Sequence, residues 1–309
     1  MTLISPTADF WFFACFALLF GLIFGSFLNV CIYRLPLGRS VVAPGSACPG
    51  CNTAIAAYDN IPVVSWWVLG GKCRHCRIAI SPRYWIVELL TGLLFFAAFV
   101  RFGPGLAAVK ICVFSFLVLG LIFTDADTHL LPDALTLPGI WIGLAFAPFV
   151  AVSGIMGLLY AWTALPPLDW HIGSFLNALA GMVLGAGFIY LAGEAWYYLR
   201  GVEAMGFGDV KLMAMVGAFL GPKLVLLTIF FGSFSGTVAG ISLAYLAYRK
   251  RLGRWKNASP DLARARAQHA TQAMMRRFPI PFGVFLGIGA LISAFFGEAL
   301  LAAYLGAFR

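Results

Sequence analysis

The 309-residue sequence has little charge for its length: 11% of its residues are charged, whereas 61% are hydrophobic. Acidic residues are scarcer than basic ones, 12 against 21, and there are only four histidines. One soluble core cannot absorb this much apolar surface, so the composition excludes an ordinary soluble domain and indicates a membrane protein. We expect no nucleic-acid partner despite the net charge of +9, because basic residues in a membrane protein record its topology.

The sequence also lacks a basic segment before its first apolar run, Phe10–Ile32, which argues against a cleaved signal peptide. Seven further apolar runs follow it: Ile86–Val100, Gly105–Phe123, Ala134–Val152, Gly173–Ala192, Val210–Leu220, Leu224–Ala247 and Ile280–Gly297. These runs predict an all-α polytopic membrane protein with about eight transmembrane helices and both termini on one side.

The basic residues divide unequally between the two sides of this predicted topology. If the loop Arg34–Trp85 is cytosolic, 17 of the 21 basic residues lie inside the cell and four lie outside. The positive-inside rule therefore favours a cytosolic position for this loop and for the long loop Lys250–Pro279.

The stretch Met205–Lys211 is a glycine-loosened acidic turn that opens directly onto an apolar run. Asp209 follows Gly206 and Gly208 there, at the edge of a membrane segment, where charged groups are costly and mark a functional site. The best partner for it is Asp125, which closes another apolar run on the same side. Two such carboxylates brought together would form an acid/base pair.

Other ionisable residues near Asp125 compete for this role. Asp127 lies two residues further on, about 200° around a continuing helix, and so faces elsewhere. Asp133 follows Pro132 and precedes an apolar run, which predicts a helix N-cap. His129 is either a third ligand or base, or a solvated loop histidine.

The run after Asp209 is short for a membrane span. Only 12 residues separate Asp209 from Gly221, where a Gly-Pro-Lys breaker begins, and this is roughly 18 Å of helix. A hydrocarbon core of about 30 Å would place Asp209 roughly 12 Å below the cytosolic surface. We therefore expect Gly206 and Gly208 to line a water-filled cavity. The alternative is that Asp209 is a plain helix N-cap.

The first cytosolic loop contains two C-x-x-C motifs, formed by Cys48 and Cys51 and by Cys73 and Cys76, with 21 residues between them. This spacing is typical of four-cysteine structural zinc sites. Disulfides are disfavoured in the reducing cytosol. A redox-active C-x-x-C pair is the alternative, but one redox motif would leave the second motif unexplained.

Polar residues gather at the membrane boundary around this loop, namely Asn29, Arg34, Asn60, Arg83 and Glu88. One interpretation is helix-end anchoring with an Arg–Glu pair, and the other is a polar ligand pocket. In the last cytosolic loop, a helix is expected from Ser259, with an apolar stripe beside basic residues. This segment, residues 259–278, either lies on anionic lipid or forms a solvated helix.

Taken in order, these motifs resemble the bacterial type IV prepilin peptidases, within the wider G-x-G-D intramembrane aspartyl proteases. The resemblance covers nearly the whole chain and rests on the following segments: Gly25–Arg34, the two C-x-x-C motifs, Asn60–Pro62, Arg83–Tyr84, Asp125–Asp133, Gly206–Lys211 and Pro281–Gly283. G-x-G-D alone would be weak evidence, whereas this many motifs in register are strong evidence.

The resemblance implies an enzyme of the bacterial inner membrane with its active site facing the cytosol. It would cleave the leader peptides of type IV prepilins and type II secretion pseudopilins, then methylate the new N-terminal residue with S-adenosylmethionine. The family's two catalytic aspartates correspond to Asp125 and Asp209. We expect residues 1–104 to form the methyltransferase part, with its zinc loop at 34–85, and residues 105–309 to form the peptidase core.

The sequence lacks a G-x-G-x-x-G nucleotide motif, and the first cytosolic loop is too short for a Rossmann domain. The methyl donor is therefore expected between that loop and the membrane, near Asn29, Arg34, Asn60, Arg83 and Glu88. A proton-coupled transporter using the two aspartates is the rival hypothesis. It does not explain the cysteine motifs, and a zinc-stabilised scaffold does not explain the depth of Asp209.

Overall fold

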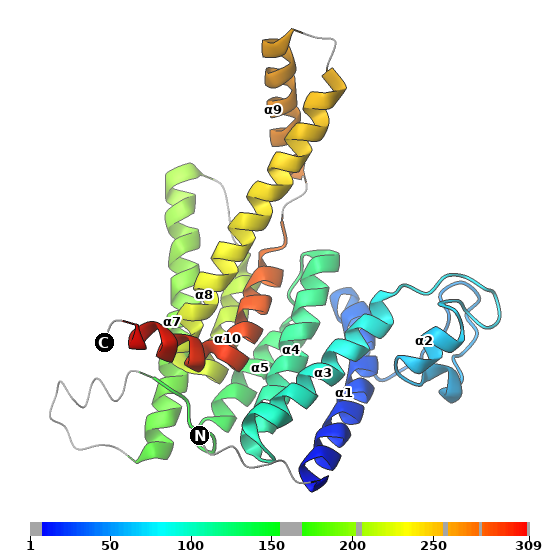
Figure 1. Cartoon of the computed structure of the whole chain (residues 1–309), viewed down its shortest axis with the longest axis vertical. Helices are drawn as coiled ribbons and strands as arrows, with labels where there is room; N and C mark the ends of the chain where they lie inside the picture. Colours follow the sequence, from blue (N-terminus) through cyan, green and yellow to red (C-terminus); the bar gives the residue numbers. More distant parts are fainter. Residues whose placement is uncertain (1–7, 155–168, 202–205, 256–258, 278–279, 308–309) are drawn as a thin grey trace, which may run out of the picture.

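Helices account for almost all of the regular structure (Figure 1). A computed structural model describes residues 8–154, 169–201, 206–255, 259–277 and 280–307, which contain no β-strand and two isolated β-bridges. The α-helices and 3-10 turns (η) are α1 (Ala8–Arg34), η1 (Leu35–Leu37), η2 (Ala57–Asn60), α2 (Val64–Val68), α3 (Arg83–Phe102), α4 (Leu106–Thr128), α5 (Asp133–Phe146), α7 (Trp170–Arg200), α8 (Phe207–Leu252), η3 (Gly253–Trp255), α9 (Pro260–Arg277) and α10 (Phe282–Gly306). The all-α prediction is confirmed.

Among the described residues, six helices are long and apolar enough to cross a membrane: α1, α3, α4, α7, α8 and α10. The apolar helix α5 has only 14 residues. Helix α8, with 46 residues, consists of two helices joined at Gly221. When α5 and the two halves of α8 are counted separately, each of the eight predicted apolar runs forms a helix. The chain is therefore a multi-pass membrane protein.

The predicted breaker at Gly221 divides α8. Gly221 has φ +81°, a left-handed value that favours glycine, and a Cβ there would lie 2.5 Å from the Ser153 carbonyl oxygen. Pro222 opens the second half of the helix. The first half, residues 207–220, is about 21 Å long, short of the roughly 30 Å hydrocarbon core. The prediction that the helix after Asp209 is too short to span is thus confirmed.

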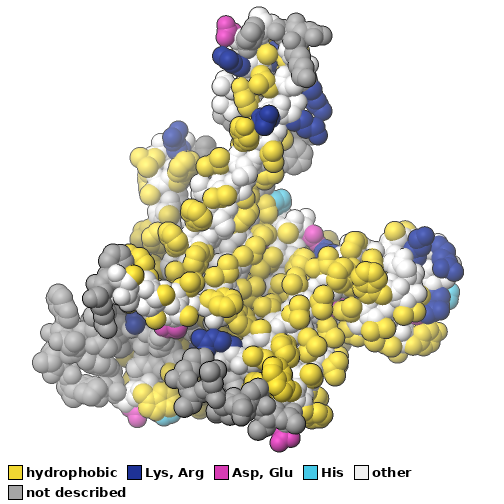
Figure 2. All heavy atoms as spheres, in the orientation of Figure 1, with side chains coloured by type: hydrophobic (Ala, Val, Ile, Leu, Met, Phe, Trp, Pro, Cys, Tyr) yellow, Lys and Arg dark blue, Asp and Glu magenta, His cyan; other side chains and the backbone are white. Residues whose placement is uncertain are grey.

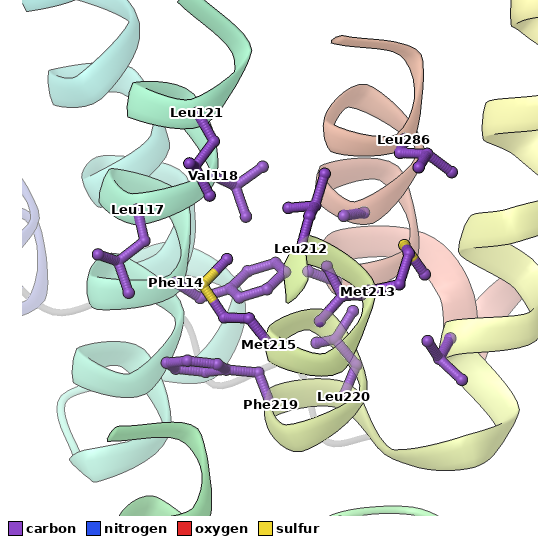
Figure 3. Packing of buried hydrophobic residues seen from close by; sticks show 14 of the residues in the cluster. Phe114, Leu117, Val118, Leu121, Leu212, Met213, Met215, Phe219, Leu220 and Leu286 are labelled. Atoms are coloured by element: carbon purple, nitrogen blue, oxygen red, sulfur yellow. The ribbon is translucent and has the colours of Figure 1, made fainter. Parts of the chain in front are cut away.

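The first half of α8 lies at the centre of the core (Figure 3). The ring of Phe219 packs 5.1 Å from that of Phe114 on α4. On another side, a Cβ at Gly217 would lie 2.0 Å from the Gly181 carbonyl oxygen, so the backbones of α7 and α8 are in contact. Small residues permit such close approach between membrane helices. Six hydrophobic residues of this half-helix are at most 1% exposed: Leu212, Met213, Met215, Val216, Ala218 and Phe219.

Two parts extend beyond the bundle in Figure 1. One is the segment between α1 and α3, residues 38–82, which we call the knuckle lobe. The other is a hairpin formed by the end of α8 and by α9. Ala263 and Ala267 of α9 are 6% and 0% exposed, and α9 packs on α8. The apolar stripe expected in this segment consists of Ala263, Ala267, Ala270, Met274 and Phe278. Its first two members are covered by α8, and Phe278 lies outside the described residues.

Candidate active site and cysteine centre

Asp125 lies in the last turn of α4 and is only 5% exposed. Its Oδ2 accepts a hydrogen bond from the Val284 N–H at 3.0 Å, and the Gly283 N–H also interacts with this carboxylate. Both amides belong to the first turn of α10, where backbone N–H groups have no partner within the helix. The carboxylate is therefore held at a helix N-terminus, a site that favours anions.

Asp209 is the third residue of α8 and is 8% exposed. The N-cap is Gly206, so the alternative in which Asp209 itself caps the helix is wrong. The Asp209 carboxylate interacts with the backbone N–H of Gly206, as acidic side chains at the third helical position do in a capping box. It also lies within electrostatic reach of Asp125. The structure thus brings the two predicted catalytic residues into one buried site.

Leu131 fills the space between the three segments that form this site. A Cβ at Gly208 would lie 3.0 Å from the Leu131 Cβ, and a Cβ at Gly283 would lie 3.2 Å from its Cδ1. The added Cβ at Gly283 would also stand 2.9 Å from the Asp125 Oδ2. The starts of α8 and α10 can therefore approach the end of α4 only because both positions are glycine. Sequence reasoning assigned no role to Leu131, although this residue lies within the Asp125–Asp133 motif.

The neighbouring acidic residues have other partners. Asp127 is exposed and pairs with Arg83 of α3, which agrees with the expectation that it faces away from Asp125. The N-cap prediction for Asp133 is wrong by one residue, because Pro132 is the N-cap and Asp133 is the first residue of α5. Asp133 accepts a hydrogen bond from Lys211 at 2.6 Å. This contact ties the start of α5 to the start of α8.

His129 ends α4 in a left-handed conformation, with φ +54°, and its side chain is exposed. Its backbone N–H donates to the Asp125 carbonyl oxygen at 2.9 Å. Its imidazole lies near enough to the Asp125 carboxylate to interact with it electrostatically, but the carboxylate's direct hydrogen bond comes from α10. The position therefore agrees better with a loop histidine than with a base.

Helices α7 and α8 extend beyond the end of α4 and the start of α10 (Figure 1). A Cβ at Gly185 of α7 would meet the carbonyl oxygen of Met213 on α8, and one at Gly181 would meet that of Gly217, so the two helices run in opposite directions here. Residue 189 of α7, one turn after Gly185, is therefore level with Asp209, one turn before Met213. From that level α7 continues for about 11 residues, roughly 16 Å, before it ends at Arg200. Gly236 of α8 lies beside Phe285, near the start of α10, and α8 then stays largely apolar until Arg249. The pair is thus recessed below the ends of both helices.

The four motif cysteines form one cluster. The Sγ atoms of Cys48, Cys51, Cys73 and Cys76 all lie within 4.8 Å of one another, and all seven cysteines are free thiols. Four sulfur ligands at such distances are those of a tetrahedral metal site. The arrangement supports the expected metal centre and not a disulfide.

Each C-x-x-C motif adopts the same backbone turn. The N–H of Cys48 donates to the Thr53 carbonyl at 3.0 Å, and the N–H of Cys73 donates to the Ile78 carbonyl at 2.9 Å. The residue after the second cysteine has a positive φ in both turns, and an antiparallel bridge closes each turn.

Arg74 forms a bidentate contact with the carboxylate of Asp59 in η2, and this guanidinium holds the pKa of the Asp59 carboxyl below its usual range.

Three of the five residues expected to bind the methyl donor lie where α1 ends and α3 begins. Asn29 is 3% exposed; its Nδ2 donates to the Tyr84 carbonyl at 2.9 Å, whereas its buried Oδ1 has no partner among the described residues. Glu88 accepts a hydrogen bond from the Val63 N–H at 2.6 Å. Arg83 pairs with Asp127 and not with Glu88, so the interpretation that included an Arg–Glu pair is wrong on this point.

The other two proposed residues lie in the knuckle lobe or at its edge. Arg34 donates to the carbonyl oxygens of Ser40 and Gly45, at 3.1 and 3.3 Å, and so holds the loop that follows α1. Asn60 ends η2 and is exposed. Asn29, Arg83 and Glu88 therefore lie together at the boundary between α1 and α3, whereas Arg34 binds the loop that follows α1.

Buried carboxylates at the ends of two helices, recessed within a multi-pass bundle, define a class of membrane proteins with an intramembrane acid pair. Family comparisons make this class specific. Residues 19–102 match the bacterial peptidase A24 N-terminal domain, and residues 111–241 match the type IV leader peptidase family. The chain belongs to the type IV leader peptidase family, and it is therefore an enzyme of the peptidase class.

Curated relatives named prepilin leader peptidase/N-methyltransferase align with most of the chain. The protein from Myxococcus xanthus is 40% identical over 252 residues, which cover 81% of this chain and 69% of the relative. Those from Aeromonas hydrophila and Pseudomonas aeruginosa are each 33% identical, over 96% and 93% of this chain and 94% and 92% of the relatives. No solved structure matches the chain. The family favours a peptidase over the proton-coupled transporter.

Proposed function

We propose that this protein cleaves the leader peptides of type IV prepilins and type II secretion pseudopilins with Asp125 and Asp209, then N-methylates the new N-terminal residue. The observation that carries the cleavage proposal is the convergence of two carboxylates, 5% and 8% exposed, from helices that are distant in sequence. The names of the curated relatives, which include both activities, support the substrate class and the methyl transfer.

The proposed chemistry follows from two close carboxylates that share one proton, since both cannot ionise cheaply. The ionised carboxylate takes a proton from water, whose oxygen attacks the scissile carbonyl carbon. The protonated carboxylate donates its proton to the carbonyl oxygen. When the C–N bond breaks, the carboxyl that took the proton of water gives it to the leaving nitrogen. The other carboxylate takes a proton from a hydroxyl of the tetrahedral diol as the new carboxyl group forms, so the pair again holds one shared proton.

The recess supports cleavage within the depth of the membrane. Helices α7 and α8 remain largely apolar above the level of the pair and become basic only near Arg200 and Arg249. If these basic ends mark the cytosolic surface of the inner membrane, the aspartates lie below it in a cavity that the starts of α8 and α10 help to line. Gly206 and Gly208 belong to this lining, and Lys211 supports it through Asp133.

A zinc ion is the metal that best fits the cysteine cluster. Cys48, Cys51, Cys73 and Cys76 supply the four thiolates of a closed structural site, with no ligand position left for a substrate. Bound zinc would contribute folding free energy to the knuckle lobe. The lobe itself provides the two turns that aim the thiols at one point.

S-adenosylmethionine is the proposed methyl donor, which supplies an electrophilic methyl group when bound. The buried and unpartnered Asn29 Oδ1 supports a polar site at the boundary between α1 and α3, with Glu88 and Arg83 beside it. Arg34 and Asn60 complete the proposed set. The separate family matches, 19–102 and 111–241, support a division into a methyltransferase part before about residue 104 and a peptidase core at 105–309.

Anionic lipid remains a predicted partner of residues 259–278. Because Ala263 and Ala267 pack on α8, such a contact would depend on the basic side chains of α9 and not on its small apolar residues.

The deciding experiment incubates the purified protein with a prepilin-like peptide and S-adenosylmethionine and measures the mass of the products. We expect a shortened peptide that then gains one methyl group. Asp125→Asn and Asp209→Asn proteins should yield no shortened peptide, and Asp127→Asn protein should remain active. Substantial cleavage by the Asp209→Asn protein would refute the assignment. Both dyad variants should still methylate a peptide that has already been cleaved.

A further inference from the structure

One face of the knuckle lobe exposes four apolar side chains. Ile61, Val64, Trp67 and Val68 are 49%, 54%, 61% and 75% exposed, and three of them belong to α2. No charged residue occurs between Ile61 and Gly71. Val64, Trp67 and Val68 share one face of α2 by their helical spacing, and exposed apolar side chains gathered in this way indicate an interaction site. We call these four residues the lobe face.

The lobe face is fixed relative to the membrane helices. Val63, the residue before α2, has φ +65°, which is rare for a β-branched residue and persists only where the surroundings impose it. Its N–H donates to the Oε2 of Glu88 at 2.6 Å, and Glu88 is a buried residue in the second turn of α3. The start of α2 is therefore attached directly to a spanning helix.

An aromatic contact continues the lobe face into that helix. The Trp66 Nε1 donates to the Ile80 carbonyl at 3.1 Å, so Trp66 belongs to the interior of the lobe. Trp67 is 61% exposed, and its ring centroid lies 5.2 Å from that of Trp66 and 5.6 Å from that of Trp85, the third residue of α3. Tryptophan is enriched at membrane–water interfaces because it is apolar with one polar N–H group.

The distribution of charge identifies the partner. Figure 2 shows hydrophobic side chains continuing from the bundle along one edge of the lobe, whereas Lys and Arg gather at its far end. The exposed cations Lys72, Arg74 and Arg77 all follow the lobe face in sequence. An uncharged apolar surface that adjoins the end of a spanning helix fits the boundary between lipid headgroups and acyl chains.

We propose that the lobe face lies in this boundary layer, so that the knuckle lobe rests on the bilayer and does not stand away from it in water. The partner is a lipid surface, recognised by apolar contact and not by headgroup charge. The inference depends on the multi-pass architecture and is independent of the proposed catalytic function.

The test uses full-length protein labelled with 5-fluorotryptophan in phosphatidylcholine nanodiscs. The signal of Trp67, one of nine tryptophans, is identified by its loss in Trp67→Phe protein. We expect lipids carrying a nitroxide near the headgroup to broaden this ¹⁹F signal and a water-soluble gadolinium chelate to leave it intact. Trp141, 72% exposed on α5, serves as the lipid-facing reference, and free 5-fluorotryptophan serves as the aqueous reference.

A matched pair of variants sharpens the test. In Val68→Glu protein, the ¹⁹F signal of Trp67 should be broadened by the gadolinium chelate and no longer by the nitroxide lipids. Val42→Glu, at an 87% exposed valine outside the lobe face, should leave the broadening of the Trp67 signal unchanged. Retained zinc in both proteins would show that the lobe is still folded. Gadolinium broadening of Trp67 in the unaltered protein would overturn the proposal. Shielding from both probes would overturn it too, in favour of a protein contact.

Discussion

The aspartate pair and the cysteine cluster are built in opposite ways. Cys48 and Cys76, whose Sγ atoms lie 3.6 Å apart, are 28 positions apart in the chain, and two similar local turns aim all four thiols at one point. Asp125, in contrast, receives its hydrogen bond from Val284, 159 positions away. One centre is made by short-range backbone geometry and the other by the packing of a helical bundle.

This difference decides what each centre depends on. The cysteine cluster needs its two turns and a metal ion, so it should respond to metal removal and leave the bundle little changed. The aspartate pair needs α4, α8 and α10 in register, so it should respond to small changes in helix packing. A change at one centre should therefore leave the structure and activity of the other centre largely intact.

The largest effect is expected from the aspartates themselves. Asn at either position leaves one carboxyl without its partner for proton transfer, so cleavage should fall by on the order of 10³-fold or more. Because Asp125 and Asp209 act as a unit, the double Asn variant should be no slower than either single variant. Rates of peptide cleavage measure this. Multiplicative losses in the double variant would mean that the two residues act independently.

The next largest effect is expected from the metal centre. Cys51→Ser should lower the zinc content and increase proteolysis within residues 38–82, because the closed site contributes folding free energy to the lobe. The melting temperature of the bundle and the rate of prepilin cleavage should change little. Elemental analysis and limited proteolysis measure the first effects. A lobe that stays protected without bound metal would contradict the comparison.

A single methyl group tests the packing of the aspartate site. At Gly283 it would stand 2.9 Å from the Asp125 Oδ2, so Gly283→Ala should displace the carboxylate or α10 and slow cleavage by roughly 10- to 100-fold. Gly236→Ala is the matched control, since its Cβ would meet Phe285 at an ordinary 3.6 Å. Equal rates in the two variants, measured as kcat, would show that the approach of α10 is not critical.

The sequence predicted what local pattern encodes. The apolar runs predicted the helices, the breaker at Gly221 predicted the division of α8, and the cysteine spacing predicted one cluster. Placing Asp127 away from Asp125 needed only the helical period. These features depend on neighbours in the chain, so the residues themselves carry the information.

Features that depend on tertiary contacts were not predictable in the same way. The capping prediction for Asp133 missed the cap by one residue, because Pro132 is the N-cap of that helix. The capping alternative for Asp209 failed in a similar way, because Gly206 is the N-cap there. The pairing of Arg83 with Asp127 joins two helices, whereas one interpretation of the sequence had an arginine paired with Glu88. The contact of α10 with Asp125 arises from a segment far along the chain, and only the family resemblance drew attention to Pro281–Gly283.

The smallest effect is expected from the ion pair between Lys211 and Asp133, although it lies close to the aspartate site. The Asp133 side chain is 56% exposed, and such pairs contribute about 0–1 kcal/mol because water screens them. Lys211→Met should therefore lower stability only slightly and reduce cleavage by no more than a few-fold. A double-mutant cycle with Asp133→Asn, followed by thermal unfolding, should give a coupling energy below about 1 kcal/mol that shrinks with added salt. A loss of cleavage as large as that of Asp209→Asn would instead place Lys211 in the catalytic machinery and make the aspartate site more than a pair.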